Sequence, residues 1–136
     1  MDVAVLPFNL VLGIVVQDNA ILLQPKPQHL NHVNTIHATV LYGIAEAAAG
    51  LCLLKRFPEL SHSYVAVLRS AEVKYRRPGH PAAELCGIGT LPESLAVRFE
   101  DTLESRGRAT LEFGVAVSQN GQELFTGSFN WFATRK

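Results

Sequence analysis

Hydrophobic residues fill the first part of the chain in two runs that a short polar segment separates. Residues 3–16 are apolar and become β-branched in their second half, and residues 20–23 form another apolar run. Turn-forming side chains occupy residues 17–19 between them, so the two runs are predicted to pair as a β-hairpin. Pro25 and Pro27 should end the second strand, because proline cannot donate a hydrogen bond to a sheet ladder.

The pattern changes near Thr35, after a polar loop over residues 28–34. The next stretch, which runs to Leu54, is too long for a strand and is rich in alanine, the best helix former. Asn34 or Thr35 should cap the start of this helix, and Pro58 should stop it. The helix is apolar nearly all round, which is typical of a helix that other structure surrounds.

The second half of the chain is predicted to be β-structure with one short helix. Asn120-Gly121 is a strong signal for a hairpin turn. Leu95, Phe99 and Leu103 are spaced four apart, which predicts an amphipathic helix within residues 92–105. The predicted strands cover 63–75, with a bulge at Ser70–Ala71, and then 82–91, 108–119 and 122–134. A sheet that curls around one buried helix fits this order, so we expect an α+β fold with residues 1–136 as a single domain.

The charge balance excludes some classes of function. The 136 residues include 12 basic and 12 acidic side chains, and the formal net charge is zero. A protein that binds nucleic acid usually carries a basic excess on one face, so that class is not expected. Residues 1–54 hold few charges, and this part of the chain should therefore be buried or pressed against a second copy. Its charged residues are Asp2, Asp18, Lys26 and Glu46.

Cysteine usage and hydropathy give expectations about the compartment. Cys52 and Cys86 are too few for a disulfide framework and have apolar neighbours, so free thiols in a reducing compartment are expected. The N-terminus lacks the basic region and cleavage site of a signal peptide. The longest apolar stretch, residues 38–54, contains Glu46 and falls short of a membrane span. We therefore expect a cytoplasmic protein that does not cross a membrane.

Glu46 is the most informative residue for chemistry. It is the only charged side chain between His37 and Lys55, and it lies in the middle of the predicted buried helix. An isolated carboxylate costs several kcal/mol to bury unless it is paired, protonated or beside a water-filled cleft. Burial also raises its pKa and makes it a better base. Two interpretations stay open: a general base, or a glutamate that hydrogen bonds across a helix pair or reaches solvent between protomers.

The start of the helix is the second candidate. His37 precedes Glu46 by nine residues, which is about 13.5 Å along a helix and on a different side of it. The two could cooperate only across a symmetric dimer or on different atoms of a substrate. Residues 31–39 should also expose backbone N–H groups at the positive end of the helix dipole, which suits a developing oxyanion. Ordinary capping and packing are the alternative roles for His37 and this loop.

Other side chains give weaker signals. His29 and His32 accompany His37, but no nearby cysteine or second carboxylate completes a metal site, so no metal is expected. No phosphate-binding glycine motif is present, and no cofactor is expected. Four arginines near predicted strand ends could bind the phosphates of a ligand, although solvated charges at strand ends are common. They are Arg76, Arg77, Arg106 and Arg108.

Several of these residues together resemble the helix motif of hotdog-fold thioesterases, most closely the PaaI-like acyl-CoA thioesterases and related domains of unknown function. The family pattern is N-x-x-G-x-x-H-G-G, followed along the helix by an acidic residue. Asn31, His37 and Glu46 match it in order and spacing, and Asn34 occupies the position of its first glycine. The strand end at residues 73–78 and the strand start at residues 106–109 also resemble short family motifs, so the similarity extends over nearly the whole chain.

This resemblance implies a hotdog fold, in which a bent antiparallel sheet wraps a long helix, and a homodimer that can pair into a tetramer. The implied substrate is the thioester of an acyl-CoA or of an acyl-carrier protein. Glu46 would be the general base or nucleophile at the dimer interface, and Asn31 and His37 would position the substrate or water. The implied oxyanion and substrate-binding residues are Ala38, Thr39 and Asn34, and the four arginines would bind CoA.

Two departures from the family pattern bear on these roles. Ala38-Thr39 replaces the pair of glycines, which restricts close approach of the backbone to a thioester. Asn34 replaces the other glycine, although asparagine also tolerates the left-handed conformation. Three functions follow: a thioesterase, a non-catalytic hotdog module that binds acyl-CoA or acyl chains, and a hotdog dehydratase. The dehydratase is the least favoured, because its proline- and glycine-rich histidine motif is missing before the helix.

Overall fold

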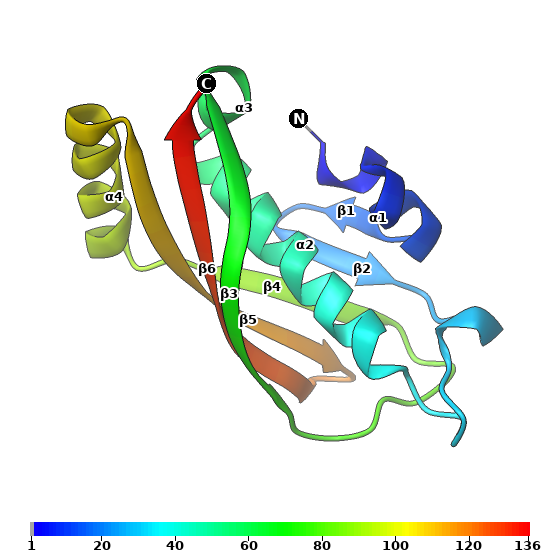
Figure 1. The fold of residues 1–136 in the computed structure, drawn as a ribbon. Helices are drawn as coiled ribbons and strands as arrows, with labels where there is room; N and C mark the ends of the chain where they lie inside the picture. The colour runs from blue at the N-terminus through cyan, green and yellow to red at the C-terminus, as the bar shows by residue number, and fades with distance from the viewer. Residues whose placement is uncertain (1) are drawn as a thin grey trace.

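A six-stranded antiparallel sheet wraps around one long helix in the computed structural model, which describes residues 2–136 (Figure 1). The strand order across the sheet is β1-β2-β4-β5-β6-β3, so β1 and β3 are its edges. The strands are β1 (Val15–Gln17), β2 (Ala20–Leu23), β3 (Tyr64–Tyr75), β4 (Leu85–Thr90), β5 (Arg108–Gln119) and β6 (Gln122–Arg135). The helices are η1 (Val3–Val5), α1 (Pro7–Leu12), η2 (Pro27–His29), α2 (Ala38–Arg56), α3 (Leu60–Ser63) and α4 (Glu93–Arg106). The predicted α+β class is confirmed.

The hairpin between β5 and β6 forms as the sequence predicts. Asn120 and Gly121 both have positive φ angles, 48° and 75°, and Gln119 pairs with Gln122 across the turn. Such a turn matches the right-handed twist of the two strands. The bulge predicted at Ser70–Ala71 lies slightly earlier, because the register between β3 and β6 shifts between Leu68 and Ser70.

The start of the long helix differs from the prediction. Ile36 is extended, because its N–H donates to the carbonyl of Gly79 (3.1 Å) and it forms a β-bridge with Leu30. α2 therefore begins at Ala38, and the cap is His37, whose Nδ1 accepts a hydrogen bond from the N–H of Thr39. Neither Asn34 nor Thr35 caps the helix.

The first apolar run also differs from the prediction, because residues 7–12 of it form helix α1 instead of strand. Pro7 occupies the first turn, and Gly13 ends the helix with φ 80°. Both are ordinary helix-boundary signals. Only Val15–Gln17 remains for the first strand of the predicted hairpin, which otherwise forms with β2.

The sheet approaches α2 most closely at β4. A Cβ atom at Gly87 would lie 2.5 Å from Cγ2 of Ile44, and one at Gly89 would lie 2.7 Å from the carbonyl oxygen of Ala48. These two positions need glycine because α2 lies directly on the strand. Further along, one face of β5 is buried, with Phe113 fully inaccessible.

The amphipathic helix α4 covers the end of the sheet near the C-terminus of α2. Its buried residues are Ala96, Phe99 and Leu103, whereas Leu95, which was predicted on that face, is 38% exposed. Phe99 packs on Phe57 with ring centroids 5.0 Å apart. Gly107 ends the helix in the left-handed conformation, with φ 68°.

Among residues 2–136, α2 is the one helix that is long and apolar enough, by length and composition alone, to cross a membrane. Its 19 residues exceed the stretch predicted from the sequence. However, 61% of its most apolar window is buried inside the fold.

Candidate active site

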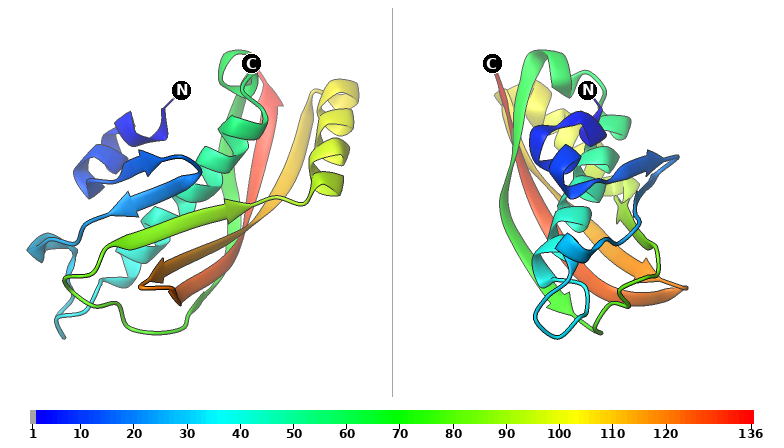
Figure 2. Two further views of the ribbon diagram at one scale, coloured as in Figure 1. Left: turned by 180° about the vertical axis from the view of Figure 1, so that it is seen from behind. Right: turned by 90° about the vertical axis from the view of Figure 1, so that its right-hand side faces the viewer.

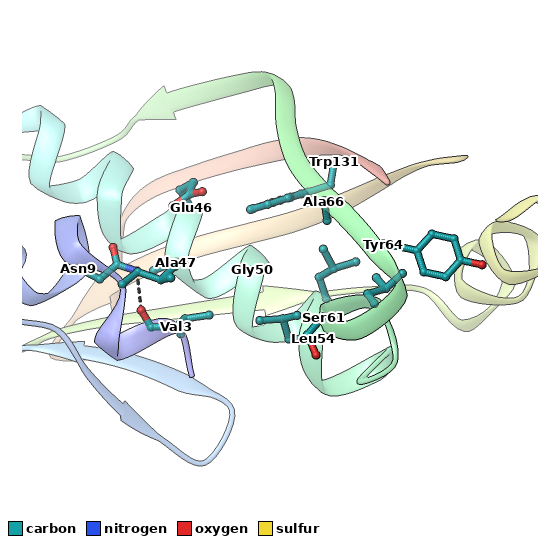
Figure 3. Close-up of a pocket in the computed structure, with 13 residues that line it drawn as sticks. Val3, Asn9, Glu46, Ala47, Gly50, Leu54, Ser61, Tyr64, Ala66 and Trp131 are labelled. Atoms are coloured by element: carbon teal, nitrogen blue, oxygen red, sulfur yellow. Dashed lines mark hydrogen bonds between the residues drawn. The ribbon is translucent and has the colours of Figure 1, made fainter. Parts of the chain in front are cut away.

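The sheet does not cover α2 on all sides, and the remaining side lies between the N-terminal segment and the edge strand β3. Figures 1 and 2 show η1 and α1 on one flank of α2 and strand β3 on the other. Between these flanks lies a cavity of about 140 Å³, shown in Figure 3. Its lining is mostly apolar, and its residues come from η1, α1, α2, α3, β3 and β6. They are Val3, Leu6, Asn9, Glu46, Ala47, Gly50, Leu53, Leu54, Leu60, Ser61, Tyr64, Ala66 and Trp131.

Glu46 is the only acidic side chain in this lining. It sits in the middle of α2, just over two turns from the helix start, and is partly buried. Within residues 2–136 it has no hydrogen-bond or ion-pair partner, and burial alone raises the pKa of its carboxyl group above the ordinary value of 4.5. A carboxylate in this setting is desolvated and unengaged, which favours proton transfer.

Tyr42 lies one helical turn before Glu46 and faces the same side of α2. Its pKa is raised, first by burial, then by the negative charge of Glu46 and by Tyr75. Its ring packs against Phe129, with centroids 5.2 Å apart. Tyr42 and Glu46 therefore lie on the same face of α2, with Tyr42 nearer the N-terminus of the helix.

Asn31 organises the loop before α2. Its Oδ1 accepts hydrogen bonds from the N–H groups of Val33 and Thr35 (both 3.1 Å), and its Nδ2 donates to Oγ1 of Thr35 (2.9 Å). Asn34 has φ 59°, the left-handed conformation that its replacement of a glycine requires. The amide of Asn31 is thus engaged within its own loop, where it fixes the backbone that leads into the helix.

The two backbone amides proposed from the sequence are not equivalent. The N–H of Thr39 donates to Nδ1 of His37 (3.1 Å), so in the neutral imidazole the proton lies on Nε2. The N–H of Ala38 has no acceptor within residues 2–136, and both residues are exposed. Ala38 is therefore the free donor at the positive end of the helix dipole.

A single chain does not bring this donor to Glu46. Ala38 and Glu46 both lie in α2, eight residues apart, which corresponds to about 12 Å along the axis. Likewise, neither Asn31 nor His37 forms a hydrogen bond with Glu46. One chain thus contains both halves of the predicted site, but at separate places on its surface.

The four arginines also lie at two separate places. Arg76 and Arg77 donate their N–H groups to the carbonyl of Leu124, near the turn between β5 and β6. The same end of the sheet reaches the start of α2 through the contact between Gly79 and Ile36. The other two, Arg106 and Arg108, precede and begin β5 at its far end, about 35 Å away along that strand.

Of the residues that line the cavity, sequence reasoning singled out only Glu46; Asn9 and Trp131 are among those it missed. Asn9 is 3% exposed. Its Nδ2 donates to the carbonyl of Val3 (2.8 Å) and holds the N-terminal segment in place. Trp131 is the only tryptophan in the chain, and its buried Nε1 has no acceptor in residues 2–136. Within the same range, no group of three or more metal-ligating side chains is clustered.

The wrapped helix and its bent antiparallel sheet define the hotdog fold, which solved structures of the same architecture confirm. The chain itself belongs to the DUF4442 family, a domain of unknown function whose model matches residues 14–132. No curated protein matches the sequence significantly.

Three solved structures illustrate the similarity of fold. A Pseudomonas aeruginosa protein of unknown function, described as a probable thioesterase, has a TM-score of 0.79 and 17% identity over 98% of this chain and 91% of its own. A mutant of the phenylacetic acid degradation protein PaaI from Thermus thermophilus has a TM-score of 0.66 and 21% identity, over 93% and 97%. A hypothetical thioesterase from Streptococcus pneumoniae, solved with coenzyme A, has a TM-score of 0.65 and 16% identity, over 90% and 85%.

Proposed function

We propose that this protein hydrolyses the thioester of an acyl-CoA or an acyl-carrier protein, with Glu46 as the catalytic carboxylate. The observation that carries the proposal is the state of Glu46. It is the one acid lining an apolar cavity, its pKa is raised by burial, and it has no partner within residues 2–136. Retaining an unpaired, partly buried carboxylate in an apolar lining costs stability, and a catalytic use would account for its presence.

The chemistry follows from the two halves of the site. As a general base, Glu46 accepts a proton from water while the water oxygen adds to the thioester carbonyl carbon. The N–H of Ala38 donates to the oxyanion that forms on the carbonyl oxygen. The carbon–sulfur bond then breaks, and the leaving thiolate takes up the proton from Glu46. In the alternative route, Glu46 attacks the carbonyl carbon, the carbon–sulfur bond breaks and the thiolate leaves and takes up a proton from solvent. Water then hydrolyses the mixed anhydride to the free acid and the Glu46 carboxylate.

A dimer would supply the missing proximity of Glu46 and Ala38. β3 is a twelve-residue edge strand, with Val65 47% and Val67 49% exposed. Such a long uncovered edge is a template for pairing with another chain. We infer that two copies pair through β3 about a two-fold axis, so that the α2 start of one protomer faces Glu46 of its partner.

The structural relatives support the substrate class. Proteins of this fold from Streptococcus pneumoniae and Bacillus halodurans were solved with coenzyme A. On this chain, Arg76 and Arg77 lie on the same end of the sheet as the start of α2. They are therefore the better placed of the two arginine pairs to bind CoA phosphates beside the oxyanion donor.

Thiol release from a panel of acyl-CoAs tests the proposal directly. We expect Glu46→Gln to lower kcat at least about 100-fold, the usual contribution of a positioned general base. The matched control is Glu104→Gln, which removes the same charge from an exposed position on α4. Equal turnover by the wild type and Glu46→Gln would contradict the assignment.

One observation favours a binding module as the second candidate: the N–H of Thr39 is engaged by His37, which leaves a single free amide at the helix start. Saturable acyl-CoA binding by the wild type with no thiol release over hours would support that candidate and exclude the thioesterase.

A further inference from the structure

We propose that the cavity beside Glu46 holds the acyl group of the substrate, and that it admits small groups only, up to about six carbons or one phenyl ring. Gly50 and Trp131 set this limit. The inference rests on the proposed thioesterase function and adds the chemical class of the acyl group.

The size of the cavity carries the first step. Its volume is about 140 Å³. An engineered apolar cavity of about 150 Å³ in another protein binds benzene, so this one accommodates a group of the same bulk. Its lining is apolar apart from a few groups, and such cavities bind apolar ligands in place of water.

The direction of the cavity carries the second step. Glu46, Gly50 and Leu54 follow one another by single turns along α2, so the cavity runs from the carboxylate toward the C-terminus of the helix. Leu53 and Leu60, 2% and 1% exposed, lie toward that end. A thioester carbonyl at Glu46 would therefore send its acyl chain toward the apolar end of the cavity that Leu53 and Leu60 line.

The N-terminal segment and Trp131 form two opposite sides of the cavity. On one side, Val3 and Leu6 belong to the N-terminal segment, which the hydrogen bond from Asn9 to Val3 ties down. On the other side, Figure 3 shows the indole of Trp131 reaching from β6 over α2 beside Gly50. A Cβ atom at position 50 would lie 3.6 Å from Cη2 of Trp131 and 3.9 Å from Cγ1 of Val3.

Gly50 is therefore not required by close packing. Those distances are ordinary van der Waals contacts, unlike the 2.5 Å approach that demands glycine at position 87. Glycine is also a much poorer helix former than alanine. What glycine provides at position 50 is open space between Trp131 and Val3, and a methyl group there would project into the cavity.

The test compares chain-length profiles. We expect the wild-type kcat/KM to rise from acetyl-CoA to hexanoyl-CoA and phenylacetyl-CoA, and to fall for decanoyl-CoA and longer chains. In Gly50→Ala the ratio of kcat/KM for hexanoyl-CoA to that for acetyl-CoA should fall about tenfold, as expected when one methylene-sized group is lost from an apolar pocket. Gly43→Ala is the control: a Cβ atom there would lie 3.0 Å from Cδ2 of Leu12 and 3.4 Å from Cε1 of Phe8, so the added methyl group meets side chains of α1 and does not enter the cavity. Its ratio should equal that of the wild type.

A binding readout separates this inference from the thioesterase proposal. Trp131 is the only tryptophan, so its fluorescence reports on the cavity without any turnover. We expect 1-hexanol to shift its emission in the wild type and in Gly43→Ala, with at least tenfold weaker affinity in Gly50→Ala. If thioesters are hydrolysed but long chains react as well as short ones, or Gly50→Ala leaves the profile unchanged, the inference is overturned and the thioesterase stands. If no thioester is hydrolysed, the proposed function fails, and the hexanol titration alone decides whether the cavity binds small apolar groups.

Discussion

At the scale of single residues, Glu46 links stability to activity. Burial raises the pKa of Glu46 in the folded protein above the ordinary 4.5 of the unfolded chain. At any pH between the unfolded and the folded pKa, the folded protein therefore holds more protons than the unfolded chain. The free energy of unfolding therefore decreases as pH rises through that window, and the penalty is fully present above it. We expect Glu46→Gln to melt at a higher temperature than the wild type at pH 7 and to lose this advantage as pH falls toward 4.5.

Thermal melts of both proteins between pH 4 and pH 8 measure this difference. Because the base acts in its ionised form, the wild-type kcat/KM should rise with pH through the same raised pKa. If Glu46→Gln were less stable than the wild type at pH 7, favourable contacts would be holding the carboxylate. The argument that ionised Glu46 lowers the stability of the fold would then be wrong.

Local chemistry singles out some residues of the candidate site in the sequence. Glu46 stands out because a charge in an alanine-rich helix has a cost, and Asn34 because it replaces a glycine with the next-best left-handed residue. Trp131 and Asn9 are different. Nothing in the sequence near either residue shows that it lies beside Glu46, because β6 and α1 reach the cavity only through the three-dimensional fold.

At the scale of elements, the contact between α2 and β4 is the tightest test of the packing. We expect Gly87→Ala to lower the free energy of unfolding by about 1–3 kcal/mol, the usual cost of overpacking a core. The added Cβ would lie 2.5 Å from Cγ2 and 3.3 Å from the carbonyl oxygen of Ile44, so helix or strand must move. Urea denaturation measures the loss, with Ile88→Ala at the adjacent exposed position as the control. A destabilisation no larger than that of the control would contradict the close approach.

Element prediction succeeded where the signal was local and failed where two signals competed. The β5–β6 hairpin follows from the turn signal Asn120-Gly121. Helix α1 was missed because its β-branched neighbours favour strand, although Pro7 and Gly13 mark both of its ends. The start of α2 was misplaced because a long-range hydrogen bond to Gly79 keeps Ile36 extended, and no local pattern encodes that bond.

At the scale of the whole molecule, the fold class was predictable because a helix without a polar face needs cover on most sides. The assembly is a separate question. The face of α2 that carries Glu46 lies between the N-terminal segment and the β3 edge, and exposed apolar residues occur on both flanks, including Phe8 at 59% and Val67 at 49%. A partner on this side would cover apolar surface and bring a second α2 start to the site.

Two inactive variants can test whether the site is shared. Ala38→Pro removes the proposed oxyanion donor and fits the structure, because Ala38 is the first helical residue and His37 before it has φ −63° and ψ 137°. We expect it to lower kcat about 100- to 1000-fold as a homodimer. In a co-expressed heterodimer with Glu46→Gln, one of the two sites combines an intact carboxylate with an intact amide. Purified through a different tag on each chain, this heterodimer should recover about half of the wild-type rate. Recovery requires the two groups to come from different chains, so a heterodimer as inactive as its parents would show that each chain works alone.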